Sequence, residues 1–161
     1  MKASIVTNNR RAPGGLFVLH ATALPGNPYD GHTLRDVIDR TETLTGCAIE
    51  RAYVDKGYRG HDAQNPRRVY ISGQKRGVFG VIKRELRRRS AIEPIIGHLK
   101  AEGHLGRCYL KGRPGDAANV ILSAVGHNFR RILAWLRELL CLILVQLWRT
   151  FGRPAPLNSP S

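Results

Sequence analysis

The pattern of apolar and polar positions begins with two short strands. Residues 3–7 (ASIVT) and 16–21 (LFVLHA) are apolar runs of strand length, and the segment between them, NNRRAPGG, is typical of a hairpin connection. A hairpin at the start of the chain leaves an edge strand exposed unless another strand pairs with it. We therefore expect an antiparallel pair with one open edge.

A helix and two further strands are predicted next. The helix opens at Asp30 or at His32–Thr33 and ends at Gly46, with Leu34, Val37, Ile38 and Leu44 on one face. Residues 48–55 (AIERAYVD) and 68–72 (RVYIS) then predict strands. A helix between strands favours a mixed or parallel sheet, so the fold class is predicted to be α/β.

From Phe79 onward the apolar spacing becomes helical. Ser90-Ala-Ile-Glu93 has the form of a capping box, and Pro94 would then lie in the first turn of a helix. The alternative is one helix over 80–101 with a kink at Pro94. After a basic link, GRCYLKGRPG, a long helix is predicted from Asp116 to about Trp148.

The end of this long helix is a run of apolar residues. LLCLILVQLW at 139–148 is too short to cross a bilayer, which needs about 20 residues, and we interpret it as a buried or interface helix. We expect one domain over 1–148, followed by a disordered Pro- and Ser-rich tail at 149–161.

The charge of the chain indicates a polyanionic partner. The sequence has 26 Lys and Arg against 12 Asp and Glu, a formal net charge of +14, and the basic residues concentrate between Arg67 and Arg113. This favours nucleic acid, with an anionic membrane surface or a merely solvated basic face as alternatives. The uniformly apolar run at 139–148 argues against a helix lying on a membrane. The three cysteines form no CxxC pair, which fits a reduced, cytoplasmic compartment.

Two acids stand out as candidates for chemistry. Asp55 closes a predicted strand, where open α/β sheets place ligands, and Glu93 lies among Arg87, Arg88 and Arg89. Carboxylates that converge in positive surroundings stay ionised and suit Mg²⁺. Each acid also has a structural interpretation, Asp55 as a turn cap and Glu93 as the capping-box partner of Ser90.

Several blocks of the sequence, taken together, resemble a known family. They are ALPGNPYDGHTL, AYVDKGYRGH, ISGQKRG…IKRELRRRSAIEPIIGHLKAEGHLGRCYLKG and GDAANVILSAVGHNFRRIL. In order and spacing, from residue 4 to about 140, they look like the C-terminal portion of a transposase of the bacterial insertion-sequence-five family. That family is of the DDE type and has a ribonuclease-H-like core.

The resemblance implies roles for individual residues. Asp55 falls on the second metal-binding acid of the family, and Glu93 on the third, with Mg²⁺ or Mn²⁺ as the metal. Arg89 and Lys100 fall on the conserved basic positions of the motif around the third acid and would contact transposon-end DNA, while Leu86 replaces a tyrosine of that motif. We expect further DNA contacts from Lys75, Arg76, Lys83 and Arg88, and supporting roles for Asp30 and Tyr58.

The first acid of the family has no counterpart in the sequence. The resemblance implies a ribonuclease-H-like mixed sheet that is incomplete, and DNA strand cleavage and transfer as the ancestral activity. We expect the chain alone to be inactive, and either to regain activity in trans with an N-terminal transposase fragment or to inhibit the full-length enzyme by competing for DNA or subunits. The protein partner expected besides DNA is such a fragment or a second copy in a homo-oligomer. The alternative is a non-catalytic, basic DNA-binding or regulatory fragment, associated with the bacterial nucleoid.

Overall fold

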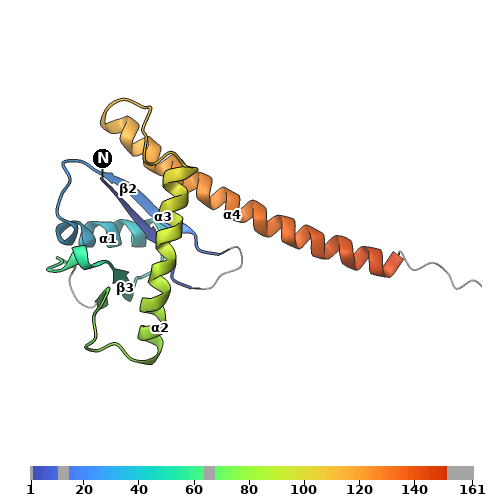
Figure 1. Ribbon diagram of the computed structural model, residues 1–161, viewed down its shortest axis with the longest axis horizontal. Helices are drawn as coiled ribbons and strands as arrows, with labels where there is room; N and C mark the ends of the chain where they lie inside the picture. Colours follow the sequence, from blue (N-terminus) through green and yellow to red (C-terminus); the bar gives the residue numbers. More distant parts are fainter. Residues whose placement is uncertain (1, 11–14, 64–67, 152–161) are drawn as a thin grey trace, which may run out of the picture.

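The computed structural model describes residues 2–10, 15–63 and 68–151, and over these residues the chain is an α/β protein (Figure 1). Two small sheets and three shorter helices form a body, and one long C-terminal helix leaves it. The α/β class and the long helix are confirmed. The prediction of a disordered tail over 149–161 is wrong for residues 149–151, which are helical, and its remaining part, residues 152–161, lies outside the described residues.

The predicted hairpin is present. Strands β1 (Lys2–Thr7) and β2 (Val18–Leu24) pair antiparallel, with an irregularity in register between Val6 and Thr7. β2 starts two residues later and ends three residues later than the predicted 16–21, because Thr22, Ala23 and Leu24 still pair with the first residues of β1. Before the strand, the Phe17 amide donates to Asn8 Oδ1 at 2.7 Å, and the Phe17 carbonyl accepts from Asn8 N at 3.2 Å. Residues 11–14 of the expected connection lie outside the described part.

The first helix begins and ends near the predicted residues. A 3₁₀ turn, η1 (Asp30–Thr33), leads into α1 (Leu34–Thr45). Gly46 ends the helix with φ of 66°, a left-handed conformation that glycine adopts without a Cβ penalty. The buried face of α1 lies toward β2 and consists of Leu34, Val37, Ile38 and Thr41. Placing Leu44 on this face was wrong, because it is 69% exposed at the last turn and Thr41 fills that part of the face.

The second pair of strands is parallel. β3 (Arg51–Val54) and β4 (Arg68–Ile71) pair in register from Arg51 opposite Arg68 to Val54 opposite Ile71. Both are shorter than predicted; β3 ends at Val54 because Asp55 already caps a 3₁₀ turn, η2 (Lys56–Tyr58), and β4 ends one residue before the predicted Ser72. Within the described residues the four strands form two separate two-stranded sheets, where one mixed sheet was expected.

The region 80–101 is one helical run with a 3₁₀ turn in its middle. α2 (Gly80–Arg88), η3 (Arg89–Ala91) and α3 (Ile92–Ala101) follow without a break, as the alternative of a single helical run predicted. The departure from the α-helix lies at 89–91, whereas Pro94, where that alternative placed a kink, is inside α3. The capping box does not form. Ser90 Oγ donates back to the Arg87 carbonyl at 2.6 Å, and no side chain caps the start of α3.

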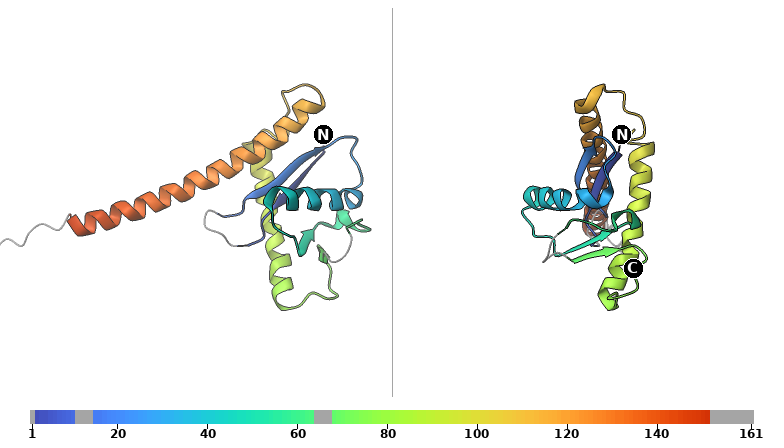
Figure 2. Two further views of the ribbon diagram at one scale, coloured as in Figure 1. Left: turned by 180° about the vertical axis from the view of Figure 1, so that it is seen from behind. Right: turned by 90° about the vertical axis from the view of Figure 1, so that its left-hand side faces the viewer.

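The core lies between the hairpin, α3 and the first part of α4 (Gly112–Phe151). Val18, Ile95, Leu99 and Ala124 form its buried cluster, with Leu99 only 1% exposed. Figure 2 shows the first part of α4 crossing beside the hairpin before the helix continues away from the body.

One polar side chain of α4 binds the edge of β2. The Asn128 amide donates to the Val18 carbonyl and accepts from the Val18 amide, both at 2.8 Å. A free strand edge has backbone groups without partners, and this side chain satisfies two of them. The contact therefore fixes α4 against the hairpin.

The rest of α4 has little contact with the body. Beyond Asn128 its large apolar side chains are 39% exposed or more, and they include Phe129 at 60% and Trp148 at 75%. The expectation that residues 139–148 are buried is therefore wrong within this chain, which leaves the interface alternative. No described helix has an apolar stretch of the length and composition that crossing a bilayer requires.

Candidate functional site

Asp55 and Glu93 lie on the two sides of one arginine. Arg89 Nη2 is 3.6 Å from Asp55 Oδ1, and Arg89 Nη1 is 3.6 Å from Glu93 Oε1. The Arg89 side chain is 16% exposed, whereas those of Asp55 and Glu93 are 61% and 68% exposed. The fold thus brings together two acids that are far apart in the sequence. The largely buried guanidinium of Arg89 lies between their two solvent-facing carboxylates.

Asp55 owes its position to the end of β3. Its backbone is extended, and its Oδ1 accepts a hydrogen bond from Lys56 N at 2.7 Å, which caps η2. The turn-capping interpretation therefore holds geometrically. It does not exclude a second role, since the same carboxylate also faces Arg89.

Glu85 holds α2 against β3. Its carboxylate, 17% exposed, accepts from the Tyr53 hydroxyl and pairs with Arg51 Nε at 3.2 Å. Burial, followed by the bond to Glu85, raises the pKa of Tyr53 far above its ordinary value, so this phenol stays protonated as a donor. Tyr53 also stacks on Tyr70 at a centroid distance of 5.4 Å. Because Arg89 follows one turn after Glu85, this network sets the distance between Arg89 and the end of β3.

Arg88 is occupied by a structural contact. Its Nη1 donates to the Asn9 carbonyl at 2.8 Å, while Asn9 Nδ2 donates to the Glu85 carbonyl at 2.9 Å. These two bonds attach Asn9, two residues after the end of β1, to the last turn of α2. Arg88 would therefore have to give up its bond to the Asn9 carbonyl, which holds the hairpin on α2, to make the predicted contact with DNA.

Asp30 and Tyr58 lie under the site. Asp30 Oδ1 pairs with Lys2 Nζ at 2.8 Å, and a Cβ on Gly57 would come within 2.8 Å of Asp30 Oδ2. Gly57 therefore allows the close approach of η1 to η2, two residues after Asp55. Tyr58 hydrogen-bonds with Ser4 of β1, and burial, then the charge of Asp30, raises its pKa. Both residues support the backbone that carries Asp55.

Two of the sequence blocks that carry the resemblance contact each other. The Tyr29 hydroxyl donates to the Arg59 carbonyl. Asp62 N donates to the Gly31 carbonyl at 3.0 Å, and Asp62 Oδ1 accepts from Arg35 N at 3.0 Å in the first turn of α1. ALPGNPYDGHTL and AYVDKGYRGH, together with Arg35 and Asp62 that directly follow them, thus form one folded unit.

A basic depression adjoins the acid pair. It has a volume of about 470 Å³ and lies between the turn after β4 and the α2–α3 run. Leu86, at the position of the family's tyrosine, is in its wall. The charged residues of the lining are Lys75, Lys83, Arg87, Arg89 and Glu93.

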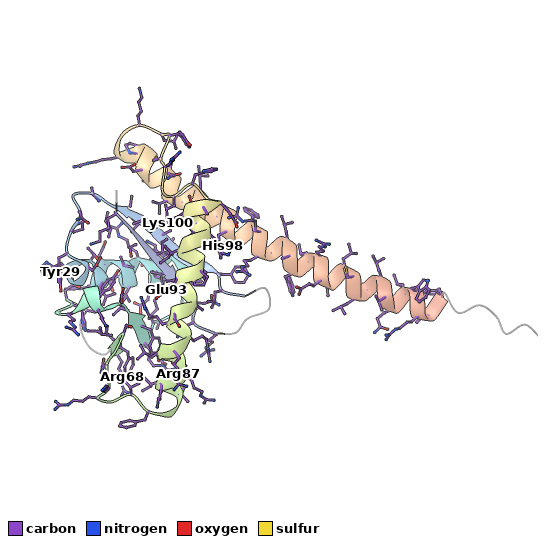
Figure 3. All side chains as sticks on the ribbon, viewed as in Figure 1. Tyr29, Arg68, Arg87, Glu93, His98 and Lys100 are labelled. Carbon is purple, nitrogen blue, oxygen red and sulfur yellow. The ribbon has the colours of Figure 1, made fainter. Side chains whose placement is uncertain are left out.

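Arg76 and Lys100, two further predicted DNA contacts, are exposed but do not line the depression. Arg76 is exposed on the turn after β4, next to Lys75. Lys100 is exposed on α3, two turns after Glu93 and on the same side of the helix (Figure 3). Of the six predicted DNA contacts, three line the depression, namely Lys75, Lys83 and Arg89.

The arrangement of donors does not fit a divalent metal ion as it stands. Carboxylate oxygens are the ligands Mg²⁺ prefers, but the Arg89 guanidinium fills the space between Asp55 and Glu93. Among the described residues there is also no group of three or more His, Cys, Asp or Glu side chains able to hold a metal. A metal would require Arg89 to withdraw and a further ligand to arrive.

Sequence reasoning missed two residues that fix helices in place: Glu85, which holds α2 on β3 next to the site, and Asn128, which holds α4 on the hairpin. Glu85 is the single acid in IKRELRRR, and Asn128 interrupts the apolar spacing of the long helix. An acid in a basic run and an amide in an apolar face were the available signals, since both are costly to place without partners.

Comparisons with protein-family models, curated proteins and solved structures found no match, so the family resemblance stays a hypothesis that rests on the residues.

Proposed function

We propose that this chain is a transposase-type DNA-binding protein. Its described residues engage DNA at the surface formed by Asp55, Arg89, Glu93 and the adjoining basic depression, which we call the Asp55–Glu93 face. The observation that carries the proposal is the arrangement of Asp55, Arg89 and Glu93 beside the basic depression. By descent the function is DNA transposition. We further propose that these 161 residues by themselves bind DNA without cutting it.

The electrostatics favour DNA as the partner. The chain carries a formal charge of +14, and four basic side chains line a depression that has one acid, Glu93. Lys75 and Lys83 are exposed, so their charges can bind phosphate oxygens and release counterions from the duplex.

The order of elements is consistent with a ribonuclease-H-like core. An antiparallel hairpin, a helix and a parallel strand pair follow one another, and the second acid of the proposed set lies directly after the parallel strand β3. Glu93 on α3 lies near the end of β3 as well, since Arg89 pairs with both Glu93 and Asp55. This order of elements supports the ribonuclease-H-like fold, which is part of the proposal.

The lack of cleavage follows from the acid pair. Two exposed carboxylates joined by a guanidinium cannot clamp the attacking and leaving oxygens of a phosphodiester as a pair of metal ions does. In a complete site Asp55 and Glu93 would be the metal ligands from this chain, and the remaining carboxylate would come from outside the described residues.

The test combines DNA binding with nicking. Fluorescence anisotropy with a labelled duplex compares the chain with Lys75→Glu/Lys83→Glu and with Arg137→Glu/Arg149→Glu, a matched control that changes the net charge equally on α4. We expect the first variant to lose at least ~10-fold in affinity, because like charge now faces the phosphates, and the control to lose much less. Equal losses would contradict binding at this face.

Nicking of supercoiled plasmid is measured in the same preparations with Mg²⁺ and with Mn²⁺. We expect no metal-dependent nicking by the chain. Nicking that disappears in both Asp55→Asn and Glu93→Gln would overturn the proposed lack of cleavage while confirming the acid pair as catalytic. Nicking that persists in both variants would indicate a contaminating nuclease, and the nicking assay would then be repeated with a repurified sample.

A further inference from the structure

The second half of α4 has an apolar surface that the body does not cover. We call Phe129–Phe151 the projecting half of α4; it leaves the body as a continuous helix (Figure 1). Its large apolar side chains are all at least 39% exposed. A helix that is apolar over most of its surface is normally buried against a partner.

One face of the projecting half has the spacing of a coiled coil. Six apolar residues follow one another at intervals of 4, 3, 4, 3 and 4, and they are between 45% and 62% exposed. Alternating steps of three and four keep a stripe facing a neighbouring helix. We call these residues the heptad face: Phe129, Leu133, Leu136, Leu140, Ile143 and Leu147.

The charges of the projecting half avoid this face. The heptad face lies within about 40° of one line along the helix, at about 100° per residue. All charged residues lie at least about 80° away from that line; they are Arg130, Arg131, Arg137, Glu138 and Arg149. The face therefore combines regular apolar spacing with an uninterrupted absence of charge.

We propose that the projecting half pairs through its heptad face with the same segment of a second copy of this chain. The segment is about 34 Å long, and pairing two such helices buries an area on the order of the ~800 Å² per partner of a stable interface. The proposal rests on α4 alone and does not depend on the proposed DNA binding.

Arg137 favours a parallel pair. With Leu136 at position d of the heptad, Arg137 is at position e and Ile132 at position g. In a parallel pair, position e of one helix lies beside position g of the other, so Arg137 lies beside Ile132 of the second copy and no like charges meet across the interface. In an antiparallel arrangement that matches Leu136 with Leu140, the two Arg137 side chains face each other and repel. The parallel pair therefore places both α/β bodies at the same end.

A second copy fits the helix better than a membrane surface. A helix that lies on a membrane has a strongly charged polar face, whereas the side opposite the heptad face also contains Val145, Trp148 and Cys141. Strict heptad spacing has no function on a lipid surface, but it is required for helix pairing.

The first test is the molar mass in solution. Sedimentation equilibrium, after nuclease treatment and at high salt, compares the chain with Leu136→Glu/Leu140→Glu and with Ala134→Glu/Val145→Glu, which adds the same charge on the other side. We expect twice the monomer mass for the chain and the control. The heptad-face variant should dissociate at least ~100-fold more readily, because unpaired carboxylates would be buried.

Three outcomes would overturn the proposal. One is a monomer at all concentrations; a second is association that resists the heptad-face substitutions. The third is a monomer that sediments with vesicles of phosphatidylcholine and phosphatidylglycerol, which would assign the face to a membrane. Circular dichroism and thermal unfolding check that the body of each variant folds, as expected for residues that are exposed in the single chain.

The second test reads the direction of the pair. Leu147→Cys is introduced after the native cysteines, Cys47, Cys108 and Cys141, have been replaced by serine. In a parallel pair the two introduced thiols lie opposite each other, so mild oxidation should yield a disulfide-linked dimer. Efficient linking of Leu147→Cys to Phe129→Cys in a mixed sample, without linking of either to itself, would contradict the parallel arrangement.

Discussion

The Asp55–Glu93 face and the projecting half of α4 are both exposed, but they differ in chemistry and in their attachment to the body. The first contains charged side chains that pair within the chain, with Arg89 between two acids and Glu85 bound to β3. The second contains apolar side chains without charge on its heptad face. One surface suits a polyanion and the other suits a similar apolar helix.

This difference predicts opposite responses to salt. Contacts with phosphate weaken as salt rises, since bound counterions are released on association. Association through apolar side chains does not depend on these ions and is maintained or strengthened by salts that are excluded from the surface. The two surfaces can therefore be tested separately in one protein.

The largest expected effect compares the same Leu→Ala substitution in the core of the body and in the projecting half of α4. Leu99→Ala removes a side chain that is 1% exposed in the core cluster, and we expect it to lower the free energy of unfolding by about 2–5 kcal/mol. Leu142→Ala, at a side chain 65% exposed in the projecting half and away from the heptad face, should change it by less than about 0.5 kcal/mol. Urea denaturation measures both. Similar losses would show that the projecting half is packed onto the body.

The next effect concerns the polar contact that fixes α4. Asn128→Ala leaves both backbone groups of Val18 without their partner, and we expect a loss of about 1–3 kcal/mol. Gln146→Ala removes the same kind of amide from the projecting half and is the matched control, with a change near zero. Hydrogen exchange at the Val18 amide should become faster in Asn128→Ala, and an unchanged rate would contradict the contact.

A smaller effect tests the charged region. Lys83 lines the basic depression, so Lys83→Ala should lower the slope of log affinity for DNA against log salt by about 0.9 in magnitude. Arg149→Ala removes one charge from the projecting half and should leave the slope unchanged. Anisotropy titrations at several salt concentrations give both slopes. If Arg149→Ala lowered the slope and Lys83→Ala did not, DNA would bind along α4.

The smallest expected effect is a dependence on pH. Burial lowers the pKa of His127 below its ordinary 6.5, the bond to the Leu16 carbonyl opposes this, and the charges of Arg131, Arg130 and His98 lower it further. The unfolded chain then binds the proton more readily, so stability should fall as the pH falls below about 6.5. Burial lowers the pKa of His20 as well.

The variant His127→Gln should reduce this loss of stability, and His32→Gln, at an exposed histidine, should leave it unchanged. Denaturation curves from about pH 7 to about pH 5 give the slope. A stability that rises as the pH falls in this window would contradict the buried position of His127.

The sequence predicted the elements better than their contacts. Apolar spacing located α1 because that helix buries a periodic set of side chains, and Gly46 marked its end through a left-handed backbone. The same kind of spacing located α4, although most of the apolar side chains that show it are exposed in this chain. The capping box failed because the chain is already helical before Ser90, so α3 has no free first turn to cap.

The site was only partly predictable for a physical reason. Asp55 and Glu93 were identified from their context, but no local pattern shows that one guanidinium lies between them. That contact depends on how α2 sits on β3, which is set by Glu85, Tyr53 and Arg51 over long sequence separations. Similarly, the projecting half is exposed because none of the described elements packs against it, which hydrophobicity alone does not reveal.

The central claim is that the Asp55–Glu93 face is where this chain engages DNA. The most direct measurement is photocrosslinking to a duplex that carries photoreactive bases, followed by mass spectrometry of the crosslinked peptides. We predict adducts within residues 72–93, reduced in Lys75→Glu/Lys83→Glu and retained in Arg137→Glu/Arg149→Glu. Adducts confined to residues 129–151 would contradict the account and would assign nucleic-acid binding to the projecting half of α4.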